Sequence, residues 1–488
     1  MRPIARIVVA AVVLGLVQAP ASSPAAEPAT VTLGGPSGVY AGSCVRARVT
    51  VQPPKPGTQV SLRETGAATP RATTTLDSQS AGWFTVCEPW ARIGANVSFN
   101  AVWSADDIQT SEGVSPVWAL RVHEAPWMAR IRRIVSGKRV GISVSEAGTV
   151  LYSRTAGTRR TPASNQKLLL SMAAMSAFGP SLRFQTVAAG PSPQGGVLRG
   201  DLWILGDGDP TVGRTAIRRL ASALVSAGLR RVEGSVRGSR GGFSRDWFAP
   251  GWKRSFPREQ VSLPTALSFR GNESRGRHIR NPEKRAARLL TRRLRKTGVA
   301  VTGKPRSGVA PGGIVPLAVV QSPTVTQILG HVNRPSWNFG AEVIGKRLGL
   351  ALAGRPGTIA KGAAAIDAWA AARGVELVAH DSSGLSYRNR VSPQGMTRLL
   401  AHSEAQPWGS SLRGSLPKPG QGTLRRRLSG VAVRAKTGTL RSISALSGYV
   451  RLSRTGTWAE FSIISRGMSK RRAVRMENRI VRILAAYA

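Results

Sequence analysis

The segment Ser164-Asn165-Gln166-Lys167 constrains the fold more than any other feature, because it places a serine and a lysine three residues apart where an apolar run begins. Pro162 breaks the preceding chain, and residues 168–177 continue without glycine or proline, which is typical of a buried helix. Side chains at i and i+3 share one helix face, so the amine of Lys167 can reach the hydroxyl of Ser164. A serine becomes a nucleophile beside such a base, and a lysine can be that base when burial, the helix N-terminus or a second cation disfavours its ammonium form.

The same spacing occurs again at Ser415 and Lys418. Pro417 lies inside this second copy and forbids the helix that the chemistry requires. Because the motif arises by chance in chains of this length, a helix start with a surface lysine is the alternative interpretation of Ser164.

A second element, Lys436-Thr437-Gly438-Thr439, precedes a run at 443–450 that is typical of a strand. On an edge strand it offers a cation, hydroxyls for a substrate carboxylate and a glycine that lets substrate approach the backbone. The other Lys-Thr-Gly, at 296–298, ends a predicted helix and supplies its C-cap. Ser336-Trp337-Asn338 precedes a further predicted helix start, and this tripeptide pattern alone is weak.

The order S-x-x-K, S-x-N and K-T-G resembles the signature of penicillin-recognising serine enzymes. More closely, the chain resembles the class C low-molecular-mass penicillin-binding proteins, the D-alanyl-D-alanine carboxypeptidase and endopeptidase family of the DacB type. The resemblance covers about residues 125–488. The segments that carry it are Pro162–Leu168, Gly206–Pro210, Asp381–Ser386, Gly414–Pro417 and Arg434–Leu440.

The resemblance implies roles for the first four site residues. Ser164 would attack the carbonyl between the two terminal D-alanines of a peptidoglycan stem peptide, and Lys167 would take its proton. Ser336 would relay a proton to the leaving amine, while Asn338 would hold the substrate and Lys167. Water would then hydrolyse the acyl-enzyme, and beta-lactam antibiotics would acylate the same serine.

For the strand motif, the resemblance implies carboxylate binding by Lys436, Thr437 and Thr439, with Gly438 between the two threonines. The backbone N–H groups of Ser164 and Thr439 would form the oxyanion hole. Trp337 and Ser382 depart from the usual family pattern, the latter standing where the family has glycine, and we expect both to bear on substrate preference.

Two other functions are weighed against this one. A class A beta-lactamase needs a further glutamate to activate the deacylating water, and no Glu-x-x-x-Asn segment supplies it. A non-catalytic cell-wall-binding protein would have no use for the intact motifs. The five histidines have no metal-ligand spacing, Gly206–Pro210 is predicted to be a tight turn, and no cofactor is expected.

The N-terminus predicts export. Arg2 and Arg6 precede the apolar run 7–17, and small residues follow to position 26, which is typical of a secretory signal peptide. We therefore expect the mature protein in the periplasm, the cell-wall space or the surroundings of a bacterium.

The region after the signal peptide contains short β-rich runs separated by turn residues every eight to twelve positions, which favours a small β-sandwich. It holds both cysteines of the chain, Cys44 and Cys87, and export favours a disulfide between them. We interpret this region as an appended binding or spacer domain.

The net charge of the chain is unusually positive, since 70 Lys and Arg against 24 Asp and Glu give +46. Such a field attracts polyanions. The signal peptide and the absence of a binding motif exclude nucleic acid, which leaves anionic cell-wall polymers or a membrane surface as partners. Solvated faces without any partner are the alternative.

Together these features predict a multidomain α+β protein. The resemblance implies a penicillin-binding-protein/beta-lactamase-like transpeptidase fold, in which helices flank a five-stranded antiparallel sheet. The expected domains are a signal peptide at 1–26, an Ig-like β-sandwich at 27–123, a serine-peptidase catalytic domain at 124–178 and 326–488, and an inserted α/β domain at 179–325.

Overall fold

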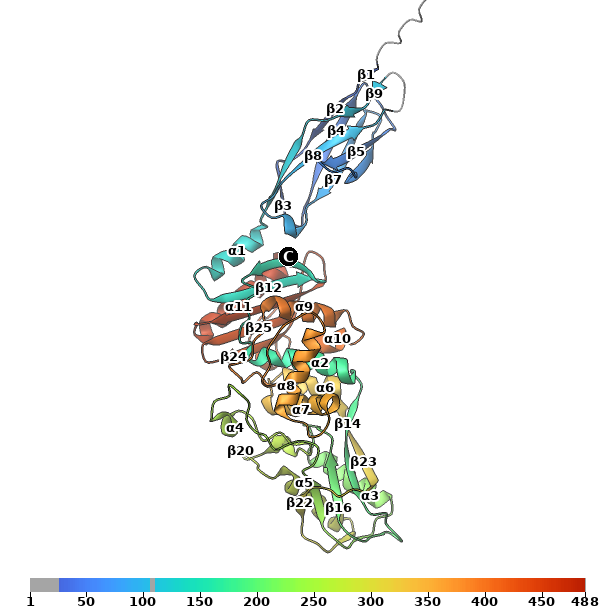
Figure 1. The fold of residues 1–488 in the computed structure, drawn as a ribbon, viewed down its shortest axis with the longest axis vertical. Coiled ribbons are helices and arrows are strands. Elements are labelled where there is room, and N and C mark those ends of the chain that lie inside the picture. Colours follow the sequence, from blue (N-terminus) through green and yellow to red (C-terminus); the bar gives the residue numbers. More distant parts are fainter. Residues whose placement is uncertain (1–25, 106–109, 488) are drawn as a thin grey trace, which may run out of the picture. The chain divides into compact units, whose positions relative to one another are not determined.

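The computed structural model describes residues 26–105 and 110–487, so the predicted signal peptide, apart from its last residue, lies outside the described residues. The described residues form two compact units, which divide between Ala125 and Pro126 and are described separately (Figure 1). No helix in the described part of the chain is both long and apolar enough to cross a membrane.

Two β-sheets enclose the core of the first unit. One has the strand order β3-β11-β8-β5-β6, with β10 paired to β8, and the other has the order β2-β4-β7. Buried Phe99 of the first sheet and Val49 of the second belong to the same apolar cluster, as in a sandwich. The elements are β1 (Glu27–Pro28), β2 (Thr30–Gly34), β3 (Gly38–Tyr40), β4 (Cys44–Gln52), β5 (Gln59–Glu64), β6 (Ala72–Thr75), β7 (Ala81–Cys87), η1 (Trp90–Arg92), β8 (Asn96–Trp103), β9 (Thr110–Ser111), β10 (Gly113–Val114) and β11 (Trp118–His123).

The two cysteines lie opposite each other on neighbouring antiparallel strands. Cys44 begins β4 and Cys87 ends β7, and the two form a disulfide. The predicted disulfide is therefore confirmed, and it joins two strands of one sheet.

A five-stranded antiparallel sheet organises the second unit, with the order β13-β12-β26-β25-β24. Side chains on β25 alternate between its faces: the hydroxyl of Ser444 donates to Glu477 of α11, whereas that of Tyr449 donates to the Leu400 carbonyl of α9. Helices therefore cover both faces, as predicted (Figure 1). The elements are α1 (Pro126–Val135), β12 (Val140–Glu146), β13 (Thr149–Arg154), α9 (Pro393–Glu404), β24 (Val433–Leu440), β25 (Ile443–Arg451), β26 (Trp458–Arg466) and α11 (Lys470–Tyr487).

On the α9 side, the sheet packs against a helical layer with a large apolar core. The central helix α2 is buried through its first ten residues, which explains why its sequence is apolar on every side. The remaining elements of this layer are η2 (Ala163–Asn165), α2 (Gln166–Phe178), α6 (Val325–Asn333), α7 (Asn338–Ala353), α8 (Ile359–Ala371), α10 (Gly409–Ser415) and η4 (Gly422–Leu424).

An α/β lobe is inserted between α2 and α6. Its sheet has the order β22-β18-β16-β14-β23 and mixes parallel and antiparallel pairs, and α3 and α5 pack with it around a separate apolar core. A three-stranded sheet, β15-β17-β21, completes it. The elements are β14 (Arg183–Gly190), β15 (Val197–Leu198), β16 (Leu202–Gly206), α3 (Arg214–Ser226), β17 (Arg231–Val232), β18 (Val236–Ser239), α5 (Pro282–Lys296), β21 (Ala300–Val301), β22 (Arg306–Gly308) and β23 (Val315–Thr324).

Part of the inserted segment leaves the lobe and returns to the helical layer. Phe256 and Val261 join an apolar cluster with Phe339 and Val343 of α7. This return places α4 (Phe256–Glu259) beside the start of α7, and a short hairpin follows, comprising η3 (Arg270–Asn272), β19 (Glu273–Ser274) and β20 (Arg277–His278).

The acidic stretch after β16 is a turn. A side-chain oxygen of Asp209 accepts hydrogen bonds from the backbone N–H and the hydroxyl of Thr211, at 2.8 and 2.6 Å. Asp207 forms an ion pair with Arg347 of α7. Both carboxylates therefore have protein partners, in agreement with the predicted turn.

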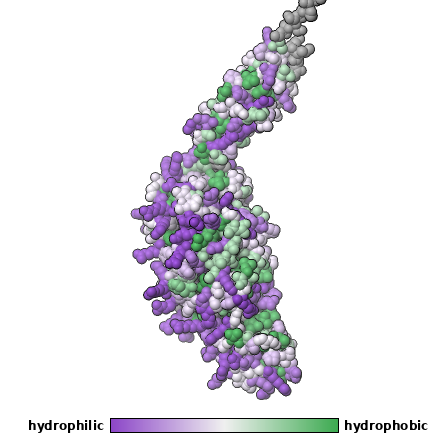
Figure 2. Space-filling view, viewed as in Figure 1, coloured by the Kyte–Doolittle hydropathy of each residue, from purple (hydrophilic) through white to green (hydrophobic). Residues whose placement is uncertain are grey.

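The surface is largely hydrophilic (Figure 2), in keeping with the many Lys and Arg residues of the chain. In the view of Figure 2, hydrophilic residues dominate the second unit, and hydrophobic residues form small separated patches.

Candidate active site

Ser164 lies in a single 3-10 turn, η2, that leads into α2. Ala163 immediately before it has a φ of +49°, a left-handed conformation that a non-glycine residue adopts only when its surroundings enforce it. Two glycines pack against this turn. A Cβ on Gly438 would lie 2.6 Å from the Pro162 carbonyl, and one on Gly384 would overlap the Ala163 carbonyl. Gly438 is thus required for packing against the serine-bearing turn, a role that differs from the predicted approach of substrate to its backbone.

Lys167 follows one residue into α2 and is fully buried. Its Nζ lies 3.2 Å from the Oγ of Ser164 and 2.8 Å from the Oδ1 of Asn338, and it also donates to the Ser383 carbonyl. Burial lowers the pKa of Lys167 to about 8, although the nearby carboxylates of Asp381 and Glu342 oppose this shift. The amine therefore lies within hydrogen-bond distance of the serine hydroxyl, and its lowered pKa lets it accept a proton near neutral pH.

A buried carboxyl group fixes the loop that Lys167 contacts. One oxygen of Glu342 accepts hydrogen bonds from the backbone N–H groups of Ser382 and Ser383, at 3.1 and 2.8 Å. Burial, and then the charge of Asp381, raises the pKa of Glu342 to about 8. Glu342 therefore orients the segment whose carbonyl accepts from Lys167.

Asp381 anchors the other side of the same loop. Its carboxylate accepts from the indole N–H of Trp252 at 2.7 Å, the amide of Asn389 at 2.7 Å and the backbone N–H groups of Gly384 and Ser386. With so many donors, the loop at 381–386 is rigidly held beneath the nucleophile.

Ser336 and Lys436 form a second polar pair. Ser336 has a φ of +62° within the tight connection between α6 and α7, and its hydroxyl contacts Lys436 of β24. The Nζ of Lys436 lies 2.9 Å from the Oγ of Ser336 and 2.8 Å from the Thr437 carbonyl. Burial, followed by repulsion from Lys167, holds the pKa of Lys436 well below its usual value.

The edge strand β24 closes the site, as predicted for the K-T-G motif. A cavity of about 400 Å³ is bordered by the half-buried Ser164, Ser336 and Asn338, and by Thr437 and Thr439 of the strand. Lys167 and Lys436 lie beneath it, each bonded to a lining hydroxyl. All eight site residues predicted from the sequence are thus brought to one place.

Several residues of the site were not predicted. Glu342 follows Asn338 at i+4 on α7, and a polar residue at this spacing on an apolar helix could have indicated it. The inserted segment adds Lys253, Phe256 and Gln260 to the cavity wall, and the Asn338 amide donates to the Gln260 carbonyl at 3.1 Å. No sequence motif within that segment indicates that it packs back against the site.

Ser382 proves to be a packing residue. Its side chain points at Gly345 on α7, where a Cβ would overlap its hydroxyl, and Ser382 is fully buried and absent from the residues that line the cavity. Ser382 stands where the family usually has glycine, and Gly345 on the facing helix leaves the space for its side chain. The expected effect of Ser382 on substrate preference finds no support in this position. Trp337 packs beside Phe339, with ring centroids 5.4 Å apart.

The second copies of the motifs lie elsewhere in ordinary structural roles. Ser415 ends α10 and is buried, whereas Lys418 is exposed. Lys296 ends α5, and Gly298 beyond it has a φ of +84° that suits a helix terminus.

As an arrangement, the site can perform acyl transfer. A hydroxyl, a buried amine with a lowered pKa, and a second hydroxyl held by another buried lysine surround one cavity, which is the set of groups needed to activate a serine and to protonate a leaving amine. In the part of the chain that the structure describes, no group of three or more His, Cys, Asp and Glu side chains is arranged to hold a metal ion.

Comparisons with known proteins agree with this chemistry. The model of the family described as D-Ala-D-Ala carboxypeptidase 3 (S13) matches residues 133–265 and 258–487. A D-alanyl-D-alanine carboxypeptidase from Actinomadura sp. (strain R39) is 27% identical over 438 residues, covering 70% of this chain and 80% of that protein. A carboxypeptidase from Mycobacterium tuberculosis is 31% identical over 366 residues, covering 67% of this chain and 76% of that protein.

Among solved structures, penicillin binding protein 4 (dacB) from Haemophilus influenzae has the same fold. The TM-score is 0.64 at 20% identity, and the match covers 74% of this chain and 99% of that protein. The same protein complexed with a beta-lactam gives a TM-score of 0.61 at 19% identity.

Proposed function

The chain belongs to the D-Ala-D-Ala carboxypeptidase 3 (S13) family, and from that premise we propose that Ser164 is the nucleophile with which it releases D-alanine from peptidoglycan stem peptides. The protein is an enzyme of the serine D-Ala-D-Ala carboxypeptidase type. The observation that carries the assignment of Ser164 is its hydrogen bond to a fully buried lysine with a lowered pKa.

Acylation begins with proton transfer from Ser164 to Lys167. With a pKa of about 8, roughly a tenth of Lys167 is neutral at pH 7, which is enough to supply a base. Asn338 and the Ser383 carbonyl hold the amine in line with the hydroxyl. The serine oxygen then bonds to the carbonyl carbon of the penultimate D-alanine, and the backbone N–H groups of Ser164 and Thr439 bind the oxyanion.

Release of D-alanine requires a proton on its amine. The proton that Lys167 took from Ser164 passes across the cavity to Ser336, and the Ser336 hydroxyl, held in place by Lys436, gives its own proton to the amine as the C–N bond breaks. Because Lys436 is fully buried, the hydroxyls of Thr437 and Thr439 make the direct contacts with the terminal carboxylate, while Lys436 holds the Ser336 hydroxyl and the Thr437 carbonyl beside them. Water admitted after D-alanine leaves hydrolyses the acyl-enzyme.

Beta-lactams would acylate Ser164 in the same way, because their strained amide occupies the place of the scissile peptide. The structural match to a penicillin-binding protein solved with a beta-lactam supports this proposal. We also propose that the enzyme works outside the cytoplasmic membrane, where peptidoglycan lies and where a disulfide such as Cys44–Cys87 persists. The β-sandwich at 27–123 would then be an accessory domain, and the segment 179–325 an inserted domain that also contributes to the site wall.

The test is D-alanine release from a peptide ending in D-Ala-D-Ala, measured for the wild type, Ser164→Ala and Ser415→Ala. Ser415 is the matched control, since it is the serine of the second S-x-x-K pattern. We expect release by the wild type and by Ser415→Ala, and none by Ser164→Ala. Equal release by Ser164→Ala and the wild type would refute the assignment. Cleavage of a cross-linked peptide dimer into its two monomers, followed by chromatography for the same three proteins, measures endopeptidase activity.

A further inference from the structure

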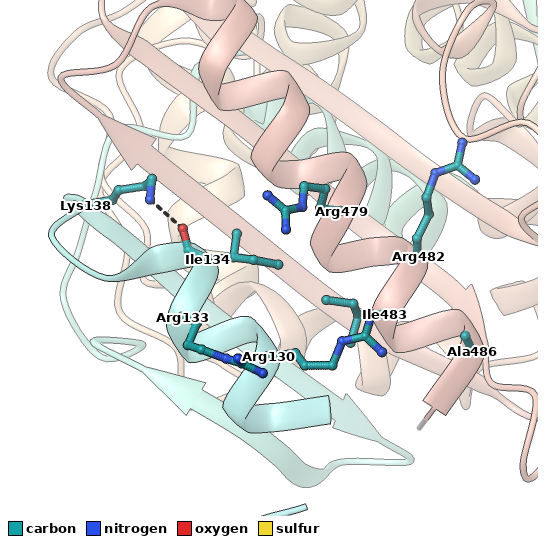
Figure 3. A pocket seen from close by; sticks show the side chains of 8 residues that line it. All are labelled: Arg130, Arg133, Ile134, Lys138, Arg479, Arg482, Ile483 and Ala486. Atoms are coloured by element: carbon teal, nitrogen blue, oxygen red, sulfur yellow. Dashed lines mark hydrogen bonds between the residues drawn. The ribbon is translucent and has the colours of Figure 1, made fainter. Parts of the chain in front are cut away.

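A basic groove lies between α1 and α11, on the face of the central sheet opposite to α9 (Figure 3). Its cavity of about 750 Å³ is the hollow between the two helices. The residues that line it are Arg130, Arg133, Ile134 and Lys138 on the α1 side, and Arg479, Arg482, Ile483 and Ala486 on the α11 side. We call this feature the basic groove.

Cations border the groove on both sides, and none of the described residues that line it is acidic. In Figure 3, Arg479 extends from α11 over the space between the helices. Lys138 donates to carbonyls at the end of α1, and Arg482 reaches the Ser429 carbonyl at 3.4 Å. These contacts use neutral acceptors, so the positive charge of the two side chains is not compensated by them.

The arginines of α11 form a regular stripe. Arg472, Arg475, Arg479 and Arg482 follow each other at three or four residues, so all lie on one exposed face of the helix. The single acidic residue of α11, Glu477, is buried on the other face, where it bonds to Arg427 and Ser444. Like charges at this spacing destabilise a helix unless an anion lies against them.

We propose that the basic groove binds a linear polyanion whose charges are phosphate groups, so that the enzyme is held on an anionic phosphate polymer while its active site works on peptides. Four of the five cations are arginines, whose planar guanidinium groups bind phosphate oxygens in pairs. The buried Ile483 and half-buried Ile134 give the groove an apolar floor for the links between phosphates.

A groove fits a chain better than it fits a flat membrane. Membrane docking by a helix pair uses exposed large apolar side chains. Among the described side chains of α1 and α11, none is an exposed large hydrophobic residue. The shape and the charge of this surface therefore favour a linear polymer over a bilayer.

The experiment measures binding of the mature protein to inorganic polyphosphate at physiological salt, for the wild type, Arg479→Gln/Arg482→Gln and Arg288→Gln/Arg292→Gln. The last pair is the control, because these two exposed arginines of α5 remove the same charge away from the groove. We expect the groove pair to weaken binding about tenfold and to lower the slope of log affinity against log salt by about two, with little change for the control pair. D-alanine release by all three proteins should be equal, which shows that they are folded.

Three results would overturn the proposal. One is failure of the wild type to bind polyphosphate, and another is an equal loss of affinity in both double variants, which would mean that net charge alone attracts the polymer. Tighter binding to vesicles of anionic phospholipid or to polyglutamate than to polyphosphate would assign the groove to a membrane or to a carboxylate polymer. Loss of D-alanine release would bear on the proposed catalytic site, whereas loss of polyphosphate binding would not.

Discussion

The carboxyl group of Glu342 accepts a hydrogen bond of 2.8 Å from the backbone N–H of Ser383, and the carbonyl of that same residue accepts one from Lys167. Glu342 thus acts on the base through a single residue, Ser383, whose N–H and carbonyl belong to adjoining peptide units. It touches neither the nucleophile nor the cavity, so we regard it as a positioning residue.

Removing the Glu342 side chain should misplace the base. We expect Glu342→Ala to slow acylation by benzylpenicillin about a hundredfold, since a shift of about 1 Å in a reacting group has that effect. Glu342→Gln keeps an acceptor oxygen and should retain most of the rate. Stopped-flow acylation of both variants decides this. Equal rates for Glu342→Ala and the wild type would mean that the loop holds its shape without the carboxyl group.

The pH dependence of acylation should follow Lys167. Only the neutral amine accepts the serine proton, so the rate constant should rise with pH and level off above the lowered pKa of about 8. Because the Glu342 carboxylate raises the pKa of Lys167, Glu342→Gln should move the midpoint to lower pH. A rate that does not change from pH 6 to 9, or full acylation by Lys167→Ala, would exclude this lysine as the base.

Gly438 should not tolerate a side chain. Gly438→Ala places a Cβ 2.6 Å from the Pro162 carbonyl, so strand and serine-bearing turn must separate. Overpacking of this kind costs about 1–3 kcal/mol, and we expect both a lower Tm and slower acylation. The control is Gly414→Ala, where a Cβ meets no atom within 4 Å. Acylation of Gly438→Ala at the wild-type rate would show that the site does not need this close packing between the strand and the serine-bearing turn.

Gly345 and Ser382 should behave as a coupled pair. Gly345→Ala overlaps the Ser382 side chain and should lower the free energy of unfolding by about 1–3 kcal/mol. The double variant Gly345→Ala/Ser382→Gly should recover most of that loss, with a coupling energy above about 0.5 kcal/mol in a double-mutant cycle. Additive effects of the two changes would show that the side chains do not meet.

Local patterns predicted the parts of the site that depend on short-range geometry. The i, i+3 spacing of Ser164 and Lys167, the edge position of Lys436 and the helix start after Ser336 follow from nearby residues. The return of Lys253 and Gln260 to the site could not be predicted, because it depends on packing between segments far apart in the sequence. The same is true of the glycines, whose neighbours are known only once the layers are assembled.

The most direct test of the account is the intact mass of the mature protein after incubation with benzylpenicillin, compared between the wild type and Ser164→Ala. We expect a persistent increase by the mass of one penicillin molecule on the wild type and no increase on the variant. An adduct that survives in Ser164→Ala, or its absence from the folded wild type, would contradict the assignment of Ser164 as the nucleophile.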